Sequence, residues 1–182
     1  MTYIRTYSGI KFPVLKPSIE HINSEDFVNV LPRIPRFGGH TRRFYSVAQH
    51  LLLVRKIAIR NYRLADVIDA SFLHDFSEVY LCDLPSPFKD ELKDYRELEE
   101  QIQEVIYKRY CCPRLKDVIK EFDISALNVE AINLMPKNDE DWKHDSDLLL
   151  PVFKTPYIPK FILKRRIRLL LKDLCKRRRV VY

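Results

Sequence analysis

Apolar residues that recur every three or four positions are the feature of this sequence that most limits its possible folds. One series runs through Val47, Leu51, Val54 and Ala58, and similar series follow in four later segments. This spacing places side chains on one face of an α-helix, so each segment is expected to bury one side against its neighbours. The chain has only 3 glycines among 182 residues, which argues against glycine-rich phosphate loops and turn-dense β architectures.

The expected elements form a mainly α single domain with a small β-hairpin at its start. The hairpin is expected over residues 3–15, with Ser8-Gly9 as its turn. A short helix is expected from Ser24, and a loop over residues 33–44 is marked by Pro35 and by Gly38-Gly39. Longer helices are expected from about Tyr45, over residues 63–81, 90–110, 115–135 (as one helix or two) and 159–178, with a loop over residues 136–158.

Cysteine usage and terminal patterns predict a cytoplasmic protein. The cysteines at 82, 111, 112 and 175 form neither a C-x-x-C pair nor a disulfide framework, so reduced thiols are expected. No apolar run approaches the length of a membrane span, and the first residues do not form a signal peptide. We therefore expect no membrane partner.

The positive charge of the chain is concentrated near its C-terminus. Residues 151–182 hold 11 Lys and Arg and one acid, whereas the remaining residues hold 21 bases and 24 acids. The last expected helix combines these bases with apolar Leu163, Ile167, Leu170 and Leu174. Such a helix can bind nucleic acid, or it can pack on the core or on a partner subunit with its basic face in solvent. Packing is favoured because no aromatic residues are interleaved to stack on bases.

The helix expected over residues 63–81 carries its apolar face directly into charged side chains. That face consists of Leu64, Val67, Ile68 and Ser71 and then continues into His74, Asp75 and Glu78. An unpaired buried charge is costly, so something must compensate it. Places where the apolar pattern conflicts with polarity are often functional sites.

Two histidines and two aspartates are candidate metal ligands. His50 lies on the inward edge of its helix, where a core histidine bonded to a backbone carbonyl is the alternative. Asp123 belongs to an inward stripe that reads Ile119, Phe122, Asp123, Ala126 and Glu130. With the His74-Asp75 pair they form a mixed N/O set, which suits Mn, Co, Zn, Ni or Fe better than Ca. A cation would replace the desolvation cost of Asp75 with a coordination bond.

Two further carboxylates follow the His74-Asp75 pair. Glu78 comes one helical turn after His74, where it can orient a water molecule or move its proton. Asp83 lies just past the expected helix and has two interpretations. It holds a ligand or a substrate hydroxyl, or it is a helix-end acid in solvent.

The sequence resembles the HD-domain metal-dependent phosphohydrolases, specifically the YfbR-like 5'-deoxynucleotidases and their phage and prophage relatives. The matching stretches are RFGGHTRRFYSVAQH, LHDFSEVYLCDLPSPFK and FDISALNVEAINLM, and the resemblance extends over most of residues 3–142. It implies one HD-type helical domain over residues 1–182, with a catalytic core over 1–150 and a basic C-terminal helix within 151–182. It also implies that His50, His74, Asp75 and Asp123 are the metal ligands.

The same resemblance implies the remaining roles. Glu78 matches the acid that positions the attacking water, and Asp83 matches the second catalytic carboxylate. Arg36, 14 residues before His50, matches an arginine that binds phosphate, for which a planar guanidinium is well suited. Phe37 stands where members selective for deoxynucleotides carry a tryptophan that excludes a 2'-hydroxyl.

Other positions are less typical of the family or have two interpretations. His40 either contacts the substrate phosphate or bonds within its loop. Lys89 either adds positive charge at the site or is solvated. Phe122 precedes Asp123, where a small residue is usual.

The expected activity is hydrolysis of deoxynucleoside 5'-monophosphates to nucleoside and phosphate. A dNTP triphosphohydrolase is the alternative enzyme, and a non-catalytic nucleic-acid-binding HD module is the alternative from another class. The expected partners are a nucleotide substrate and further copies of the chain in a homo-oligomer, a dimer or higher. Nucleic acid is not an expected partner.

Overall fold

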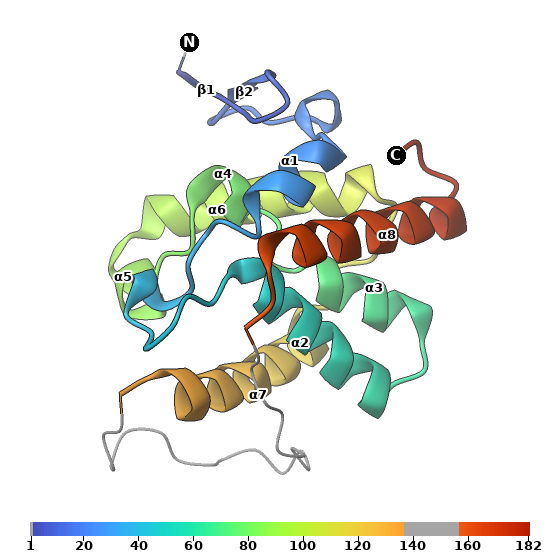
Figure 1. The fold of residues 1–182 in the computed structure, drawn as a ribbon. Helices are drawn as coiled ribbons and strands as arrows, with labels where there is room; N and C mark the ends of the chain where they lie inside the picture. Colours follow the sequence, from blue (N-terminus) through green and yellow to red (C-terminus); the bar gives the residue numbers. More distant parts are fainter. Residues whose placement is uncertain (1, 137–156) are drawn as a thin grey trace.

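A computed structural model describes residues 2–136 and 157–182 and is mainly helical, which confirms the predicted class (Figure 1). Its elements in chain order are β1 (Tyr3–Arg5), β2 (Lys11–Pro13), α1 (Ser24–Val30), α2 (Val47–Asn61), α3 (Ala65–Leu73), α4 (Glu78–Leu81), α5 (Ser86–Glu91), α6 (Lys93–Arg109), α7 (Lys116–Leu134) and α8 (Lys160–Arg178), with 3-10 turns η1 (Ile19–His21) and η2 (Phe37–Gly39). Within the described residues, no helix is both long and apolar enough to cross a membrane.

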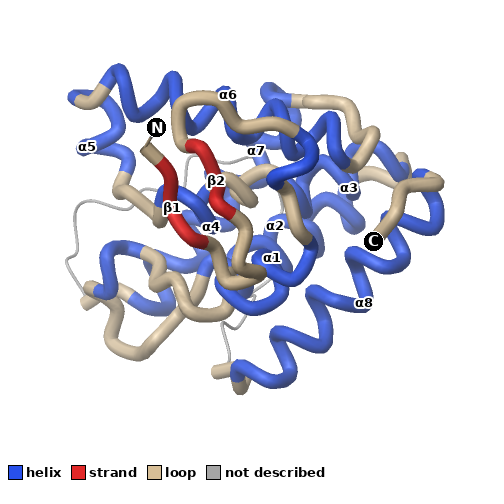
Figure 2. Tube along the Cα trace, turned by 90° about the horizontal axis from the view of Figure 1, so that it is seen from above, coloured by secondary structure: helices blue, strands red, loops and turns tan. Residues whose placement is uncertain are grey.

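The N-terminal hairpin forms as predicted and is anchored on α4. β1 and β2 pair antiparallel with Ile4 opposite Phe12, and Gly9 takes a φ of +85° in the turn, which glycine adopts without strain. The Phe12 ring is fully buried and stacks on Tyr80 with ring centroids 3.9 Å apart. The sheet therefore covers the segment that follows the His74-Asp75 pair, as the view from above shows (Figure 2).

Helix α2 lies at the centre of the bundle and contacts α3, α7 and α8. It begins at a capping box, in which Ser46 and Gln49 each bond the other's backbone N–H. Its predicted inward face is buried, with Val47, Leu51 and Val54 at 0% exposure. His50 lies on this buried side, so the central helix delivers an imidazole to the interior.

The prediction of one helix over residues 63–81 is wrong, because the chain breaks the helix just before the site. α3 ends at Leu73, residues 74–77 form a tight turn, and α4 is a separate short helix. In the turn, backbone bonds join residues three apart: Phe76 N–H donates to the Leu73 carbonyl at 3.1 Å, and Glu78 N–H to the Asp75 carbonyl at 3.2 Å. His74 and Asp75 therefore project from a helix end instead of from a continuous helical face.

Side chains from α6 stabilise this break by satisfying backbone groups that a continuous helix would pair. Gln103 Nε2 donates to the Leu73 carbonyl at 2.8 Å, and Gln103 Oε1 accepts from Ser77 N–H at 3.1 Å. Tyr107 Oη donates to the Ala70 carbonyl at 3.2 Å. Gln103 is buried and thus joins both sides of the turn that carries His74 and Asp75.

Two other helix predictions are settled by the structure. The helix predicted over residues 90–110 is divided at Leu92 into α5 and α6, since Leu92 has the non-helical ψ of 78°. The segment predicted as one helix or two over residues 115–135 is the single helix α7. Most of the loop predicted over residues 136–158 lies outside the described residues.

Helix α8 packs on α1 and α2 (Figure 1). Leu163, Ile167 and Leu174 are buried as predicted, whereas Leu171 takes the buried position expected for the partly buried Leu170. The helix therefore belongs to the core of this chain through its apolar side.

Several bases of α8 are paired with acids of the bundle. Arg168 lies 2.8 Å from Glu25, and Arg177 lies 2.6 Å from Asp69, which is almost fully buried. Arg178 bonds the other oxygen of Asp69 at 3.1 Å. These bases neutralise acids of the bundle and hold α8 against it.

We predict that Gln103→Ala lowers the free energy of unfolding by about 1 to 3 kcal/mol, because it leaves the buried Ser77 N–H without a partner and the Leu73 carbonyl with only its bond from Phe76 N–H. Gln101→Ala is the matched control, since Gln101 is exposed on the same helix, and its cost should stay within about 0.5 kcal/mol. Urea denaturation of both variants measures the difference. Equal stabilities would show that Gln103 does not hold the break.

Candidate metal centre

Four ligand atoms from three parts of the chain converge in the structure. They belong to His50 on α2, to His74 and Asp75 in the turn after α3, and to Asp123 on α7, and all lie within 4.8 Å of one another. His50 Nε2 lies 3.1 Å from Asp123 Oδ1 and 3.4 Å from Asp75 Oδ2. His74 Nε2 lies 3.2 Å from the same Asp75 oxygen and 3.3 Å from His50 Nε2.

The other nitrogen of each imidazole has a fixed acceptor. His50 Nδ1 lies 2.8 Å from Glu130 Oε1, and His74 Nδ1 lies 2.8 Å from the Ser71 carbonyl. Since a carboxylate and a carbonyl only accept, both Nδ1 atoms carry the proton. When the rings are neutral, both Nε2 atoms present lone pairs to each other and to two carboxylate oxygens. The cluster therefore needs positive charge, supplied either by protons on these nitrogens or by a cation.

The electrostatics of the cluster favour positive charge. Burial alone lowers the pKa of His74, but the Asp75 and Asp123 carboxylates outweigh it and raise the pKa to about 9. Burial and Arg36 lower the pKa of His50, yet Glu130 and the two aspartates leave it well above its usual value. Burial raises the pKa of Asp75 and Asp123, and the imidazoles more than reverse the shift. A bound cation would replace the protons that the imidazoles attract.

The donor set therefore fits a divalent metal ion. Two imidazole nitrogens and two carboxylate oxygens form the mixed set that transition metals accept. The hydrogen bonds of Glu130 and Ser71 fix both ring orientations, as is usual for histidines that bind metals. The predicted ligands are thus brought together and could hold a metal ion.

Glu130 is a site residue that the sequence did not identify. Its side chain is fully buried on α7; one oxygen accepts from His50, and the other lies 3.5 Å from Arg36 Nη2. It links the ligand cluster to the arginine predicted to bind phosphate. The sequence did contain a signal for Glu130, because it lies on the inward stripe of α7 and a buried carboxylate needs partners. In the structure its exposure is 0%.

Arg36 reaches the cluster from the loop before α2. Its N–H donates to the Tyr45 carbonyl at 2.9 Å, next to an isolated bridge between Pro35 and Ser46. Its Nη1 lies 3.4 Å from Asp83 Oδ1 and 4.0 Å from Asp75 Oδ2. Burial lowers the pKa of Arg36, but the carboxylates around it raise the pKa overall, so the guanidinium stays charged.

The loop after Arg36 has an unusual left-handed backbone. Phe37, Gly38 and Gly39 have φ values of 56°, 58° and 86°. Only glycine adopts such values without cost, so Phe37 is strained, and strain of this kind concentrates at binding sites. Phe37 also lines the cavity that lies beside the ligand cluster.

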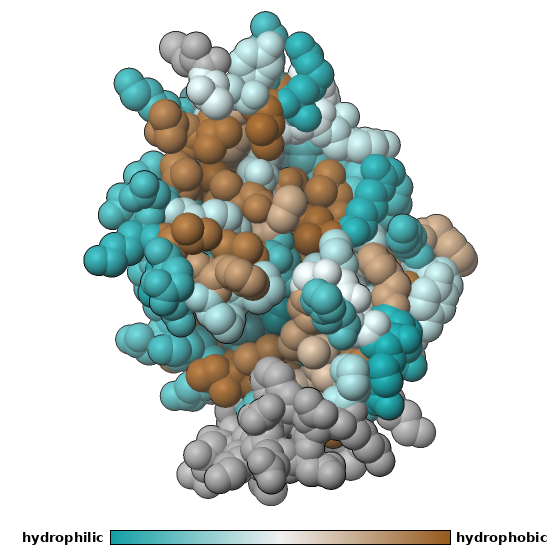
Figure 3. Space-filling view, turned by 90° about the vertical axis from the view of Figure 1, so that its left-hand side faces the viewer, coloured by the Kyte–Doolittle hydropathy of each residue, from teal (hydrophilic) through white to brown (hydrophobic). Residues whose placement is uncertain are grey.

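A cavity of about 290 Å³ opens beside the ligand cluster. Its wall consists of Arg36, Phe37, Asp75, Glu78, Asp83, Leu84, Pro85, Ser86, Pro87, Lys89, Asp123 and Leu127. Figure 3 views the side of the molecule on which α5 lies and shows apolar side chains around a recessed hydrophilic area. The cavity therefore combines a charged end with an apolar wall.

Three polar atoms of the cavity lack protein partners. Glu78 Oε2, Asp83 Oδ2 and Arg36 Nε are buried without a hydrogen bond among the described residues. Burial, followed by the nearby Asp75 and Asp83 charges, raises the pKa of Glu78 well above its usual range. Burial also raises the pKa of Asp83, although Arg36 opposes the shift. Such groups are suited to hold water or substrate.

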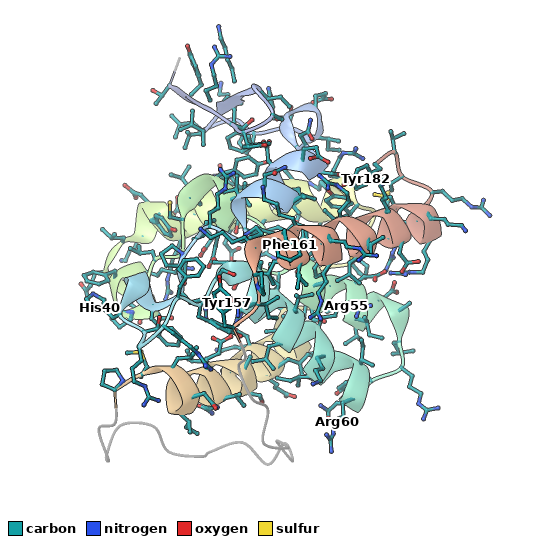
Figure 4. The ribbon with its side chains drawn as sticks, in the orientation of Figure 1. His40, Arg55, Arg60, Tyr157, Phe161 and Tyr182 are labelled. Carbon is teal, nitrogen blue, oxygen red and sulfur yellow. The ribbon has the colours of Figure 1, made fainter. Side chains whose placement is uncertain are left out.

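The two remaining predicted residues differ in position. Lys89 lines the cavity, and its Nζ lies 2.6 Å from Glu99 Oε1 and 3.8 Å from Glu78 Oε1. It is thus not a solvated lysine. His40 is exposed at the edge of the molecule and is absent from the cavity wall (Figure 4). The structure therefore does not bring His40 into the cluster.

Comparison with known proteins finds two relatives of similar length but no matching family model. Uncharacterized protein YfdR of Escherichia coli (strain K12) is 33% identical over 143 residues, which cover 78% of each chain. Uncharacterized protein RCAP_rcc00048 of Rhodobacter capsulatus is 31% identical over 142 residues and 70% of each chain. These relatives carry no statement of activity, so the chemistry must be argued from the site.

We predict that Asp123→Ala removes bound metal, because it deletes one of the four converging ligand atoms. Asp117→Ala is the matched control, as Asp117 is exposed on the same helix. The loss of affinity should exceed the roughly 10- to 100-fold penalty that is typical of changes outside the ligand set. Metal analysis of the purified variants, after loading with Mn, Co or Zn, measures it. Full occupancy in Asp123→Ala would exclude this residue as a ligand.

Glu130→Gln should weaken metal binding about 10- to 100-fold without abolishing it, because the amide holds the His50 ring but no longer supplies negative charge. The exposed Glu121 of α7 provides the control variant Glu121→Gln. Titration of the metal-free proteins with Mn or Zn gives both dissociation constants. An unchanged constant in Glu130→Gln would contradict the role assigned to this carboxylate.

Proposed function

This chain belongs to the same family as YfdR of Escherichia coli, and we propose that it is a metal-dependent phosphohydrolase of the HD type. The proposed substrates are deoxynucleoside 5'-monophosphates, and the products are nucleoside and phosphate. The observation that supports this proposal most strongly is that four side chains share the wall of one cavity: Asp75, Asp123, Arg36 and Glu78, whose Oε2 has no partner among the described residues.

This grouping supplies what hydrolysis of a phosphate ester requires. A cation site, a guanidinium and a carboxylate with a free oxygen lie around one space, so a phosphate there can meet a nucleophile and a charge-stabilising group together. A bound divalent metal would supply Lewis acidity and lower the pKa of water at the site.

Arg36 binds and stabilises the phosphoryl oxygens in this proposal. Its guanidinium is held between Asp83 and Glu130, which fixes its plane before the substrate arrives. A preorganised guanidinium matches two phosphate oxygens at once and adds no reorganisation cost during the reaction.

Glu78 orients the attacking water and accepts its proton. Its Oε2 has no partner among the described residues, and its raised pKa, caused mainly by burial, makes it a stronger base than an exposed glutamate. Asp83 holds Arg36 with one oxygen and presents the other to a substrate hydroxyl. The two carboxylates therefore have separate tasks.

The apolar part of the cavity supports a nucleotide over a bare phosphate ester. Phe37, Leu84 and Leu127 line the same space as the charged groups. Such surfaces suit the faces of a base and a sugar. The alternative of a nucleic-acid-binding module is less well supported, because Arg168, Arg177 and Arg178 on α8 are paired with carboxylates.

We predict that Glu78→Gln keeps its metal and its fold but loses about 10²- to 10⁴-fold in turnover, because it removes the base that acts on the water. Glu97→Gln, at an exposed position of α6, is the control. The assay uses dNMPs, NMPs and dNTPs with Mn, Co or Zn, and it resolves phosphate, pyrophosphate and triphosphate as products.

The same assay separates the competing functions. Triphosphate released from dNTPs would identify a triphosphohydrolase, and loss of metal in Glu78→Gln would make Glu78 a ligand. Absence of turnover with all three metals and all three substrate classes would reject the proposed function.

A further inference from the structure

Glu99 is a partly buried carboxylate that the proposed reaction does not use. Its side chain is 22% exposed, and its Oε1 lies 2.6 Å from Lys89 Nζ. Lys89 belongs to α5 and Glu99 to α6, two helices that meet at Leu92. A short, charge-assisted bond at this depth fixes the flexible lysine side chain in one position.

The ion pair of Lys89 and Glu99 stands between two cavities. Lys89 lines the 290 Å³ cavity, and Glu99 lines a second cavity of about 380 Å³ that also reaches His74 and Asp123. Asp123 borders both cavities, so the ligand cluster lies between them. The pair thus forms part of the partition beside the cluster.

Lys89 has a second anionic neighbour in Glu78. The distance from Nζ to Glu78 Oε1 is 3.8 Å, which is too long for a hydrogen bond. Burial lowers the pKa of Lys89, but Glu78 and Glu99 raise it overall, so the ammonium stays charged. An ammonium has three donors. With one donor directed to Glu99, the others remain free for an anion in the first cavity.

We infer that Glu99 is a positioning residue: it holds Lys89 toward the substrate phosphate and prevents the ammonium from closing on Glu78. Without Glu99, the nearest anion to Lys89 in the described residues is Glu78, and a direct bond would occupy the carboxylate that is to hold the water. This inference rests on the proposed function and assigns a specific task to Glu99.

The adjacent Glu100 provides a matched control. Its side chain is 55% exposed and pairs with Lys116 at 2.8 Å, away from Lys89. Glu99 and Glu100 have the same charge and neighbouring positions on α6, but only Glu99 contacts Lys89. Comparing variants at these two positions separates the effect of moving Lys89 from the effect of changing the net charge of α6.

The experiment compares Glu99→Ala, Glu99→Gln and Glu100→Ala in the full chain loaded with Mn. We expect Glu99→Ala to lower kcat about 10- to 100-fold, the scale of a misplaced active-site group, and to weaken inhibition by inorganic phosphate, with metal content unchanged. Glu99→Gln should retain most activity because its amide oxygen still accepts from Lys89. Glu100→Ala should match the wild type.

A double-mutant cycle tests whether Glu99 acts through Lys89. In a Lys89→Ala background, Glu99→Ala should cause no further loss, because the group that it positions is gone. Independent losses would overturn the inference. If Glu99→Ala does not fold, Glu99→Asp replaces it in the experiment. This variant keeps the negative charge, but its shorter side chain pulls the Lys89 ammonium away from the first cavity. We therefore expect weaker inhibition by phosphate in Glu99→Asp as well.

Phosphate binding distinguishes failure of this inference from failure of the proposed function. If the wild type hydrolyses no nucleotide, calorimetric binding of inorganic phosphate still compares the variants, and weaker binding in Glu99→Ala than in Glu100→Ala supports the positioning of Lys89. Equal phosphate binding in both variants would overturn the inference. A lower urea midpoint with unchanged kcat and phosphate inhibition would likewise show that Glu99 is only structural.

Discussion

Four lone-pair atoms that face one another inside a helical bundle are the constraint on which the rest of this structure depends. His50 and His74 each donate from Nδ1 to a fixed acceptor, so both Nε2 atoms meet the oxygens of Asp75 and Asp123 as acceptors. Without positive charge between them, these atoms repel one another. Burial strengthens this repulsion because the surroundings screen it less than water does.

The bundle contains specific devices that hold these atoms together. The break after α3 directs His74 and Asp75 toward α2, and Gln103 holds both sides of the break. Glu130 fixes His50 from α7 and reaches Arg36 with its second oxygen. The same carboxylate thus connects the cation site with the group proposed to bind phosphate, so a disturbance of one should reach the other.

The sequence predicted the converging set because His50 and Asp123 sit at inward positions of periodic segments and the His74-Asp75 pair directly follows another one. It could not predict the helix break, since Phe76 and Tyr80 continue the apolar pattern through residues where the backbone is no longer regular. The groups that stabilise the break, Gln103 and Tyr107, come from α6, and periodicity carries no information about such distant hydrogen bonds.

Glu99 was missed for a related reason. The helix predicted over residues 90–110 lacked the bend at Leu92 that brings α5 back against α6, so the proximity of Lys89 could not be foreseen. Likewise, Leu171 is buried in place of Leu170, because the packing of α8 on α1 and α2 sets which face turns inward.

The four residues of the ligand cluster differ in how deeply they are buried, and this difference bears on what the cluster can do. His50 is fully buried, whereas the Asp123 side chain is 41% exposed and borders both cavities. A structural metal site is closed on all sides, while a catalytic one keeps a position open to water and substrate. The buried side of this cluster carries the hydrogen bonds that fix its geometry, and its open side faces Arg36, Glu78 and Lys89. One cluster therefore combines ring orientations fixed by buried hydrogen bonds with access from two cavities, which is the combination that the proposed function needs.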